Sequence, residues 1–241
     1  MEGTNFRIAS VNANGIDKQK IDKIYELMNQ EITLIQETHN GFKKETISYT
    51  EEKLNAIVLN SDYTRNNVKG RVAIILKISN KCKWEIVENK KLFQGRLLHI
   101  KINKINIINI YFPANKYKKI DFIDNLNKYF SAYSVEDLII GGDFNWVGEN
   151  IDRKGELTTN DKGFSKSMEN LFNKHNLTDI YRRQNLLRTE YTYEYKNNCA
   201  SRIDRLYGTN FNAKGLYVKL QITSNKIPDQ EEGVFKEKKP G

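Results

Sequence analysis

The residues best suited to chemistry follow an apolar run in the second half of the chain. Residues 138–140 are apolar, and two glycines separate them from Asp143 and Asn145. This pattern is typical of a buried strand that opens into a polar loop. Glycine lets the backbone turn sharply or approach a ligand closely, so Asp143 and Asn145 are expected at the end of a rigid element. An ordinary turn is the alternative, because Gly, Asp and Asn favour turns.

Four further predicted strands place polar groups in the same way. These groups are Asn12 with Asn14 after 6–12, Glu37 after 32–35, Tyr111 near the end of 105–112, and Asp204 within 202–207. Strand ends at one edge of an α/β or sandwich architecture converge on one cleft. Carboxylates and amides are hard oxygen ligands, which suit Mg²⁺ better than zinc. With Asp143 deprotonating or orienting water, the expected chemistry is hydrolysis of a phosphodiester.

Each of these residues also has an ordinary structural interpretation. Tyr111 could be an edge-strand aromatic, and Glu37 a capping residue. Asp204 could pair with Arg202 or Arg205 in a surface ion pair that contributes little stability. All of these placements together would require a coincidence, which favours a functional site.

Composition predicts one basic, globular domain. The chain has 241 residues, 39% of them hydrophobic, and a formal net charge of +9. This length allows a full hydrophobic core. The charge favours a polyanionic partner, with nucleic acid as the first candidate and an acidic lipid surface as the second.

Cysteine and histidine usage gives no sign of a disulfide framework or a zinc site. The chain has only Cys82 and Cys199, and His39, His99 and His175 lack metal-ligand spacing. No apolar run reaches the length of a membrane span, and no signal peptide is recognisable. We expect a protein of a reducing intracellular compartment, nuclear or cytoplasmic, without a membrane partner.

Periodicity predicts strands joined by short connections and a few helices. Helices are expected at 17–29, 116–133 and 160–175, and strands at 6–12, 32–35, 54–59, 72–78, 83–88, 95–102, 105–112, 138–140, 189–195, 202–207, 215–222 and 233–235, with a hairpin loop at 196–201. Ile120, Ile123, Leu126 and Phe130 form an apolar stripe on the second helix. The predicted fold class is α/β, with a largely antiparallel sheet core covered by helices. The domain is expected at 6–235, between tails at 1–5 and 236–241.

Seven segments, in this order, resemble the endonuclease/exonuclease/phosphatase superfamily, and specifically the apurinic-endonuclease-like endonuclease domain of LINE-type (non-LTR) retrotransposons. The segments are 11–15, 35–39, 109–113, 142–145, 152–153, 190–193 and 202–204. The resemblance spans nearly the whole chain. It implies a four-layer α/β sandwich with two packed sheets and a magnesium-dependent nick in DNA, with Mn²⁺ as an alternative ion.

The resemblance also implies a role for each matching residue. Glu37 is the principal metal ligand, and Asn12 lies near the metal and the phosphate. Tyr111 and Asn145 contact the scissile phosphate, whereas Asp143 orients or activates the nucleophilic water. Thr192 and Arg153 contact DNA or support the site.

The sequence departs from the superfamily pattern at its last motif. A Ser-Asp-His triplet is expected, with a carboxylate matching Asp204 bracing its histidine, but this chain has Pro228, Asp229 and Gln230. Asp229 can still assist the metal. Gln230 can hydrogen-bond a phosphate, but it carries neither a titratable proton nor a positive charge. Losing such a group typically costs ~10²–10⁴ in rate.

Three functions are compatible with these motifs and with the departure at Gln230. The first is a DNA endonuclease, impaired by Gln230, whose nick provides a 3′-hydroxyl primer for target-primed reverse transcription. The second is an inactive DNA-binding domain or relic, and the third a superfamily phosphatase acting on a small phosphorylated substrate. For the first, the partners are double-stranded DNA and, in an intact element, its RNA and a reverse transcriptase in the same polyprotein. We expect a monomer.

Basic loops around the site are the expected DNA contacts, because such loops bind phosphates. They comprise Asn14, Arg65, Lys69, Arg71, Lys116, Lys118, Lys119, Arg153, Arg182, Arg183, Thr192 and the 196–202 hairpin with Arg202. A solvated face is the alternative for any one lysine.

Overall fold

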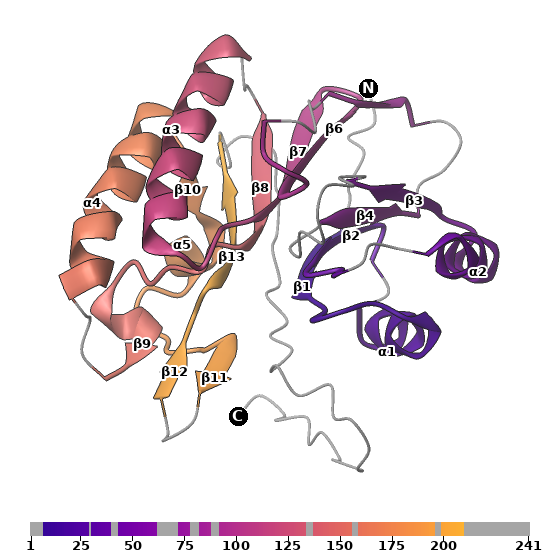
Figure 1. Cartoon of the computed structure of the whole chain (residues 1–241), viewed down its shortest axis with the longest axis horizontal. Helices are drawn as coiled ribbons and strands as arrows, with labels where there is room; N and C mark the ends of the chain where they lie inside the picture. Colours follow the sequence, from indigo (N-terminus) through magenta and orange to yellow (C-terminus); the bar gives the residue numbers. More distant parts are fainter. Residues whose placement is uncertain are drawn as a thin grey trace.

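Two packed sheets lie between two helical layers in the computed structural model of the chain (Figure 1). The structure describes residues 7–28, 30–39, 43–61, 72–77, 82–87, 92–133, 137–155, 159–195 and 199–209. The prediction of a four-layer α/β sandwich is confirmed. Outside the described residues lie the predicted strands 215–222 and 233–235 and both predicted tails, 1–5 and 236–241. Residues 62–71 lie outside them as well.

The first sheet has the strand order β1-β2-β4-β3. Its strands are β1 (Ile8–Asn12), β2 (Ile32–Gln36), β3 (Ile57–Asn60) and β4 (Ala73–Leu76). Helix α1 (Lys18–Met28) joins β1 to β2, which are parallel, and α2 (Lys44–Leu54) precedes β3. The two helices cover the outer face of this sheet (Figure 1).

The second sheet has the strand order β10-β13-β8-β7-β6-β5. Its strands are β5 (Trp84–Ile86), β6 (Leu97–Ile102), β7 (Ile105–Tyr111), β8 (Leu138–Asp143), β10 (Thr178–Asp179) and β13 (Asp204–Gly208). Helix α3 (Lys116–Ala132) crosses from β7 to its parallel neighbour β8. Helices α3 and α4 (Thr159–Lys174) cover the outer face, and α5 (Ile180–Gln184) follows β10 (Figure 1).

A small third sheet lies beside the second. It consists of β9 (Arg153–Lys154), β11 (Tyr193–Tyr195) and β12 (Cys199–Ser201), with the one-turn 3₁₀ helix η1 (Asn150–Asp152) before β9. Strands β11 and β12 form the predicted hairpin, and they project below the main sheets in Figure 1.

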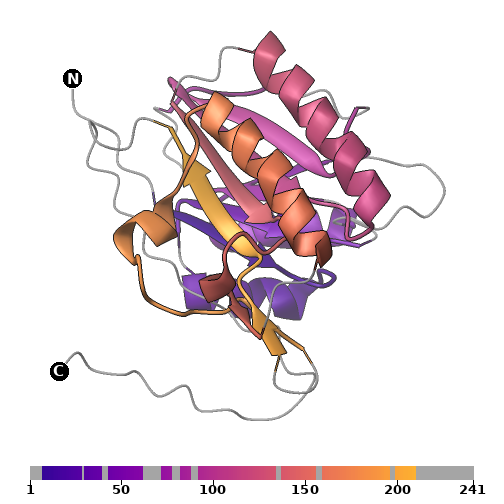
Figure 2. The same cartoon turned by 90° about the vertical axis from the view of Figure 1, so that its left-hand side faces the viewer.

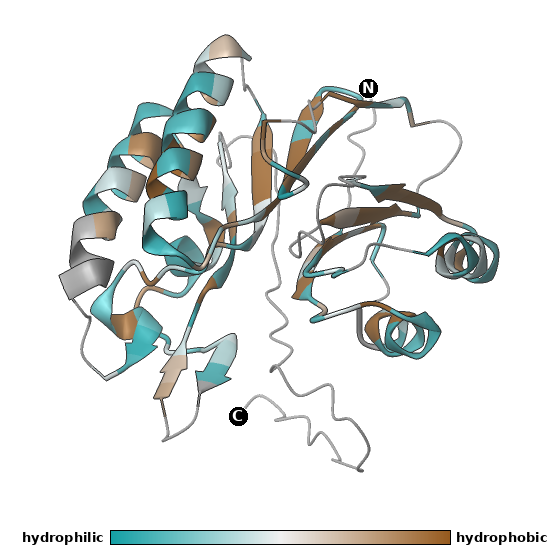
Figure 3. Cartoon of the chain, in the orientation of Figure 1, coloured by the Kyte–Doolittle hydropathy of each residue, from teal (hydrophilic) through white to brown (hydrophobic). Residues whose placement is uncertain are grey.

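Apolar side chains fill the space between the two main sheets. Leu34 and Ile74 of the first sheet and Ile139 and Leu206 of the second belong to one buried cluster. Hydropathy colouring shows the sheets as the apolar layers and the outer helices as largely polar (Figure 3). This distribution is the expected result of burying one face of each element.

The two glycines of β8 are required for strand packing. A Cβ on Gly141 would lie 2.5 Å from side-chain atoms of both Leu34 and Leu206, so glycine lets the sheets approach each other there. Gly142 has a φ of +149°, and its Cβ would lie 1.9 Å from the carbonyl oxygen of Ile110. Both glycines therefore lie within β8 and not in the polar loop after it.

A buried polar bridge joins the two sheets. The Gln36 side chain of β2 donates to Asn109 Oδ1 of β7 over 2.7 Å. Asn109 Nδ2 donates to the carbonyl oxygens of Ile35 at 2.9 Å and Ala73 at 2.7 Å. Because both side chains are fully buried, this bridge fixes how one sheet is placed against the other.

Several predicted boundaries were wrong. The strand expected at 54–59 begins at Ile57, because Leu54 ends the unpredicted helix α2 and Asn55 adopts a left-handed conformation. Ile120 is 47% exposed and does not extend the buried stripe of α3. Residues 199–201 form strand β12 and not a loop.

Across the described chain, no helix has both the length and the apolar character needed to span a membrane.

Candidate active site

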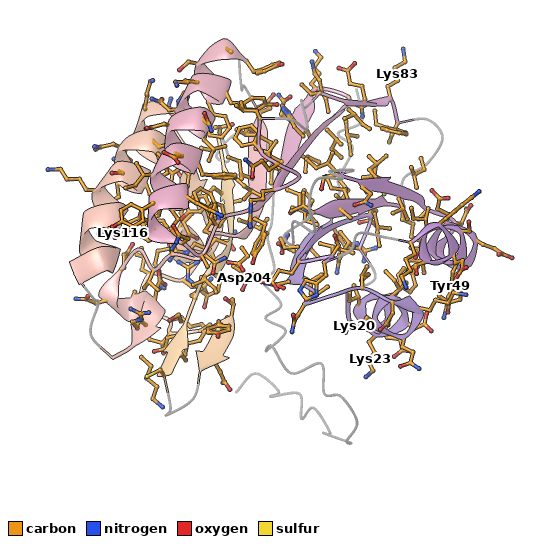
Figure 4. The ribbon with its side chains drawn as sticks, in the orientation of Figure 1. Lys20, Lys23, Tyr49, Lys83, Lys116 and Asp204 are labelled. Atoms are coloured by element: carbon orange, nitrogen blue, oxygen red, sulfur yellow. The ribbon has the colours of Figure 1, made fainter. Side chains whose placement is uncertain are left out.

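Polar groups from five strands meet at one edge of the two packed sheets. Parallel strands β1 and β2 bring Asn12 and Glu37 to this edge, and parallel strands β7 and β8 bring Tyr111 opposite Asp143. Strand β13 runs the other way, so its first residue, Asp204, is the one opposite Asp143. Asp204 is thus the first residue of β13, and Figure 4 shows it between the halves of the molecule that contain the two main sheets.

The Asn12 side chain links the two sheets within the site. Its Nδ2 atom donates to Glu37 Oε1 over 2.9 Å and to Asp143 Oδ2 over 3.0 Å. Its Oδ1 atom accepts from the backbone nitrogen of Asn14 at 3.1 Å, which fixes the orientation of the amide. One amide therefore holds a carboxylate from each sheet.

The loop after β8 holds the other oxygen of Asp143. The backbone N–H of Asn145 donates to Asp143 Oδ1 over 2.7 Å. Asn145 Nδ2 donates to the Phe112 carbonyl oxygen over 2.9 Å, and Lys119 Nζ contacts the Asn145 carbonyl oxygen. Asn145 is thus fixed between the ends of β7 and β8.

Four non-glycine residues at this edge have left-handed backbone conformations. Asn14, Glu37, His39 and Asn145 have φ values between 44° and 53°. Asparagine tolerates this region, but glutamate rarely adopts it. The Glu37 carbonyl oxygen accepts from Gly15 N at 2.6 Å, which helps to hold the conformation. Such strain, of order 1–3 kcal/mol per residue, is typical of functional sites.

Burial and like charge raise the pKa values of both aspartates. The pKa of Asp143 is well above its usual value, chiefly because the carboxylate is buried, and also because Asp204 and Glu37 are close. Desolvation raises the pKa of Asp204 to about 6, although a hydrogen bond with Thr192 opposes the shift. This environment disfavours ionisation of Asp143 and Asp204 at the same time unless a cation is bound.

Tyr111 is held as a neutral phenol beside these carboxylates. Its pKa is raised, first by burial and then by the negative charges of Glu37 and Asp143. The guanidinium of Arg96 lies over its ring, 4.8 Å from the centroid. A neutral hydroxyl can donate a hydrogen bond to a phosphate oxygen.

Thr192 holds the backbone at Asp204 through hydrogen bonds. Its hydroxyl oxygen accepts from the backbone nitrogens of Ile203 and Asp204, each at 3.0 Å. The Thr192 side chain is buried, so the structure places it as a support for Asp204 and not at a surface.

The donor set suits a Mg²⁺ ion that keeps some of its waters. Within the described residues, no three Asp, Glu, His or Cys side chains could hold a metal by themselves. Magnesium commonly uses one or two carboxylates and completes its shell with water and substrate phosphate. Asp204 Oδ1 is buried and has no hydrogen-bond partner among the described residues, so this oxygen is available to a cation. Glu37, Asp204 and Asn12 therefore fit such an ion.

Arg202 lies in the interior and does not contribute to a DNA-binding surface. It is 1% exposed, and its guanidinium bonds to Asp152 Oδ1 and Asp179 Oδ2, each at 2.7 Å. Arg182 and Arg205 also bond to Asp152. Asp152 is therefore the acceptor for three buried arginines.

Six of the expected DNA contacts named by residue, among them Lys118, Lys119 and Arg183, lie at the surface or partly so. Lys116 is exposed at the start of α3 (Figure 4), and Asn14 is exposed after β1. Arg153 is half-buried, and its Nε atom lies 3.4 Å from Ser201 Oγ. Arg65, Lys69, Arg71, Asp229 and Gln230 lie outside the described residues.

Two residues at the site have contacts that sequence reasoning missed. Lys20 Nζ donates to the carbonyl oxygens of Ala13 at 3.2 Å and Asn14 at 2.8 Å, so α1 braces the turn after β1. His39 Nε2 lies 3.4 Å from Glu37 Oε2. The contact of His39 could have been predicted from its position two residues after Glu37. No sequence pattern indicated the contacts of Lys20 beyond its charge.

Comparison with known proteins agrees with this geometry. No family model matches the sequence. A relative, the "Transposon TX1 uncharacterized 149 kDa protein" of Xenopus laevis, is 25% identical over 213 residues, covering 83% of this chain. The match covers only 16% of that protein, so the chain corresponds to about a sixth of its relative.

Solved structures of nucleases share the fold. An AP endonuclease from Archaeoglobus fulgidus matches with a TM-score of 0.65 and 18% identity, over 86% of this chain and 87% of that one. The 3′ phosphatase NExo from Neisseria, bound to a product DNA hairpin, matches with a TM-score of 0.62 and 15% identity, over 85% and 87%. These likenesses agree with the resemblance carried by the sequence motifs: the chain has the fold of the AP endonuclease and of NExo, and it is similar to part of a transposon protein.

Proposed function

We propose that this chain is a Mg²⁺-dependent DNA endonuclease that nicks one strand of duplex DNA. The observation that carries this proposal is the Asn12 amide, which holds Glu37 of one sheet and Asp143 of the other in a single polar site. A buried carboxylate with a raised pKa, beside oxygen donors and a neutral phenol, is suited to hydrolysis of a phosphodiester.

Each residue has a distinct part in this proposal. Asp143 accepts a proton from the attacking water, because burial raises the pKa of its carboxylate and so makes it a stronger base. Tyr111 and Asn145 donate hydrogen bonds to the scissile phosphate. Glu37, Asp204 and Asn12, assisted by Asp229, hold the Mg²⁺ ion, which when bound polarises a phosphoryl oxygen and neutralises developing charge.

The transposon relative suggests the biological use of the nick. In an element, the free 3′-hydroxyl would prime reverse transcription of element RNA by a polymerase in the same polyprotein. The basic net charge of +9 supports a DNA substrate. We propose a monomeric domain, because one chain supplies the site groups from all five strands.

A second candidate activity is removal of a terminal phosphate. NExo is described as a 3′ phosphatase, and its site lies on the same fold. A phosphatase would use Glu37, Asp143 and Asn145 in the same way, but would not need exposed basic residues such as Lys116.

Nicking of supercoiled plasmid tests the proposal. The wild-type protein should convert supercoiled to open-circular DNA with Mg²⁺ and not with EDTA. Asp143→Asn should lower the rate at least about 100-fold. Asp124→Asn, a change on the exposed side of α3, is the matched control and should leave it unchanged.

Product analysis separates the candidates. Nicked plasmid that a DNA polymerase extends without further treatment carries a 3′-hydroxyl. Release of phosphate from a 3′-phosphorylated oligonucleotide, without plasmid nicking, would favour the phosphatase. Equal nicking by Asp143→Asn and wild type would refute the assignment of the site.

A further inference from the structure

Two adjacent leucines are presented to solvent between α5 and β11. Leu186 is 69% exposed and Leu187 is 88% exposed, the highest value among the large apolar side chains of the described residues. Exposed leucines cost little singly, but two together at the tip of a turn form an apolar projection.

A buried guanidinium holds this turn in place. Arg182 Nη1 donates to the carbonyl oxygens of Asn185 at 3.0 Å, Leu186 at 3.3 Å and Arg188 at 3.0 Å. Arg182 is itself 7% exposed and bonds to the buried carboxylate of Asp152. The two leucines are therefore carried on a turn whose backbone is fixed from the protein interior.

The chain connects this turn directly to the active site. Leu187 lies five residues before Thr192, whose hydroxyl accepts from the backbone nitrogen of Asp204. Five residues span at most about 17 Å, which equals the rise of about five base pairs. Figure 2 shows the segment that leaves α5 running along the lower side of the molecule to the β11–β12 hairpin.

We propose that Leu186 and Leu187 insert as an apolar wedge between base pairs of the DNA duplex bound at the site. Leucine is one of the side chains that proteins insert between base steps from the minor groove, where it unstacks the bases and bends the duplex. Arg183 and Arg188 are exposed on either side of the leucines, and Arg188 forms an ion pair with Glu190, so a guanidinium lies on each side of the apolar tip. This arrangement matches the phosphates that border a groove.

The wedge would give the domain a preference for deformable DNA. Unstacking costs least at flexible pyrimidine–purine steps, so such steps should be favoured without any hydrogen bond to a base. This inference rests on the proposed function, because it requires that the duplex be bound at the Asp143–Asp204 edge.

Binding of a 25-base-pair duplex in EDTA, measured by fluorescence anisotropy across a salt titration, tests the wedge. The Leu186→Ser/Leu187→Ser variant should bind about tenfold more weakly than wild type. Its slope of log Kd against log salt should be unchanged, because the wedge contacts no phosphate. An Ile86→Ser/Leu92→Ser variant changes two other exposed apolar residues and should bind as wild type does.

A base analogue reports the insertion itself. With 2-aminopurine at successive positions of the duplex, wild type should increase the fluorescence at one step near the nick, and the double serine variant should not. Equal affinity and equal fluorescence for the two proteins would overturn the wedge while leaving DNA binding intact. Failure of wild type to bind DNA would overturn the proposed function as well.

Sedimentation of the free proteins tests a competing role for the turn. Both proteins should be monomers. A wild-type dimer that the double serine variant dissociates would make the turn a contact between two copies of the chain, and would contradict the wedge.

Discussion

Asp204 lies directly opposite Asp143 in the antiparallel pair that β13 forms with β8. Residues directly opposite each other in a sheet place their side chains close together, and like charges there are destabilising. Burial raises the pKa of both aspartates, and the charge of Asp204 raises the pKa of Asp143 further. The fold therefore maintains an arrangement of carboxylates that is unfavourable without a cation.

We expect Asp204→Asn to stabilise the metal-free protein at neutral pH. The folded-state pKa of Asp204 is about 6, above its usual value of 3.8, so its contribution to stability is lost as pH rises through this interval. Asn at this position does not titrate, so the variant does not lose this stability. Its free energy of unfolding should exceed that of wild type by about 1–3 kcal/mol at pH 7.5 in EDTA, as measured by urea unfolding.

Added Mg²⁺ should reverse the order of the two proteins. Wild type should gain stability with increasing Mg²⁺, because the ion binds the folded state. The variant has lost a proposed ligand and should gain less. A variant that is no more stable than wild type in EDTA would contradict the carboxylate repulsion.

The Gln36–Asn109 bridge should contribute strongly to stability. Replacing Asn109 by leucine leaves the Gln36 amide and the carbonyl oxygens of Ile35 and Ala73 without this partner in the interior. Each buried unsatisfied group costs about 1–3 kcal/mol, so the free energy of unfolding should fall by about 3 kcal/mol or more. Urea unfolding measures this change, and Asp124→Ala on the surface of α3 should stay within about 0.5 kcal/mol of wild type.

His99 should make the protein less stable in mild acid. The ring is buried between Tyr129 Oη at 2.6 Å and Asn106 Oδ1 at 3.1 Å, and burial lowers its pKa to about 4. The unfolded chain takes up the proton near pH 6.5, so stability is lost as pH falls from 6.5 toward 4.

A glutamine at this position separates the histidine from other acid effects. Between pH 7 and pH 5, wild type should lose about 2 kcal/mol more than His99→Gln, which keeps polar atoms but does not titrate. Thermal unfolding at both pH values measures the difference. Parallel losses in the two proteins would show that His99 is not the titrating group.

Sequence patterns were sufficient to predict most of the strands and the meeting of their polar ends at one edge. Strand ends carry chemistry because a rigid element fixes them, and the segments ending at Asp143 and Tyr111 have strong apolar periodicity. Helix α2 was missed because its buried face includes Thr46 and Thr50, which do not give an apolar stripe. Periodicity detects a helix only when its buried face is hydrophobic.

The charged residues were harder to place than the strands. Arg202 was expected at a DNA-binding surface because of its charge, but three arginines share the buried Asp152. The four residues of that cluster come from η1, α5, β13 and the two-residue segment that precedes β13. These elements are distant in the sequence, and only the tertiary structure brings them together. The Asn12 link between Glu37 and Asp143 likewise depends on how two sheets pack, which no local pattern encodes.

Gln230 is the residue whose replacement should most increase nicking. The superfamily pattern has histidine here, and glutamine supplies neither a proton near neutral pH nor a positive charge for the phosphate. Gln230→His should therefore raise the rate of Mg²⁺-dependent plasmid nicking by about 10²–10⁴. Gln230→Asn, which keeps an amide, is the matched control and should not raise it. Nicking by wild type that is already as fast as by Gln230→His would show that this site cuts DNA without an imidazole.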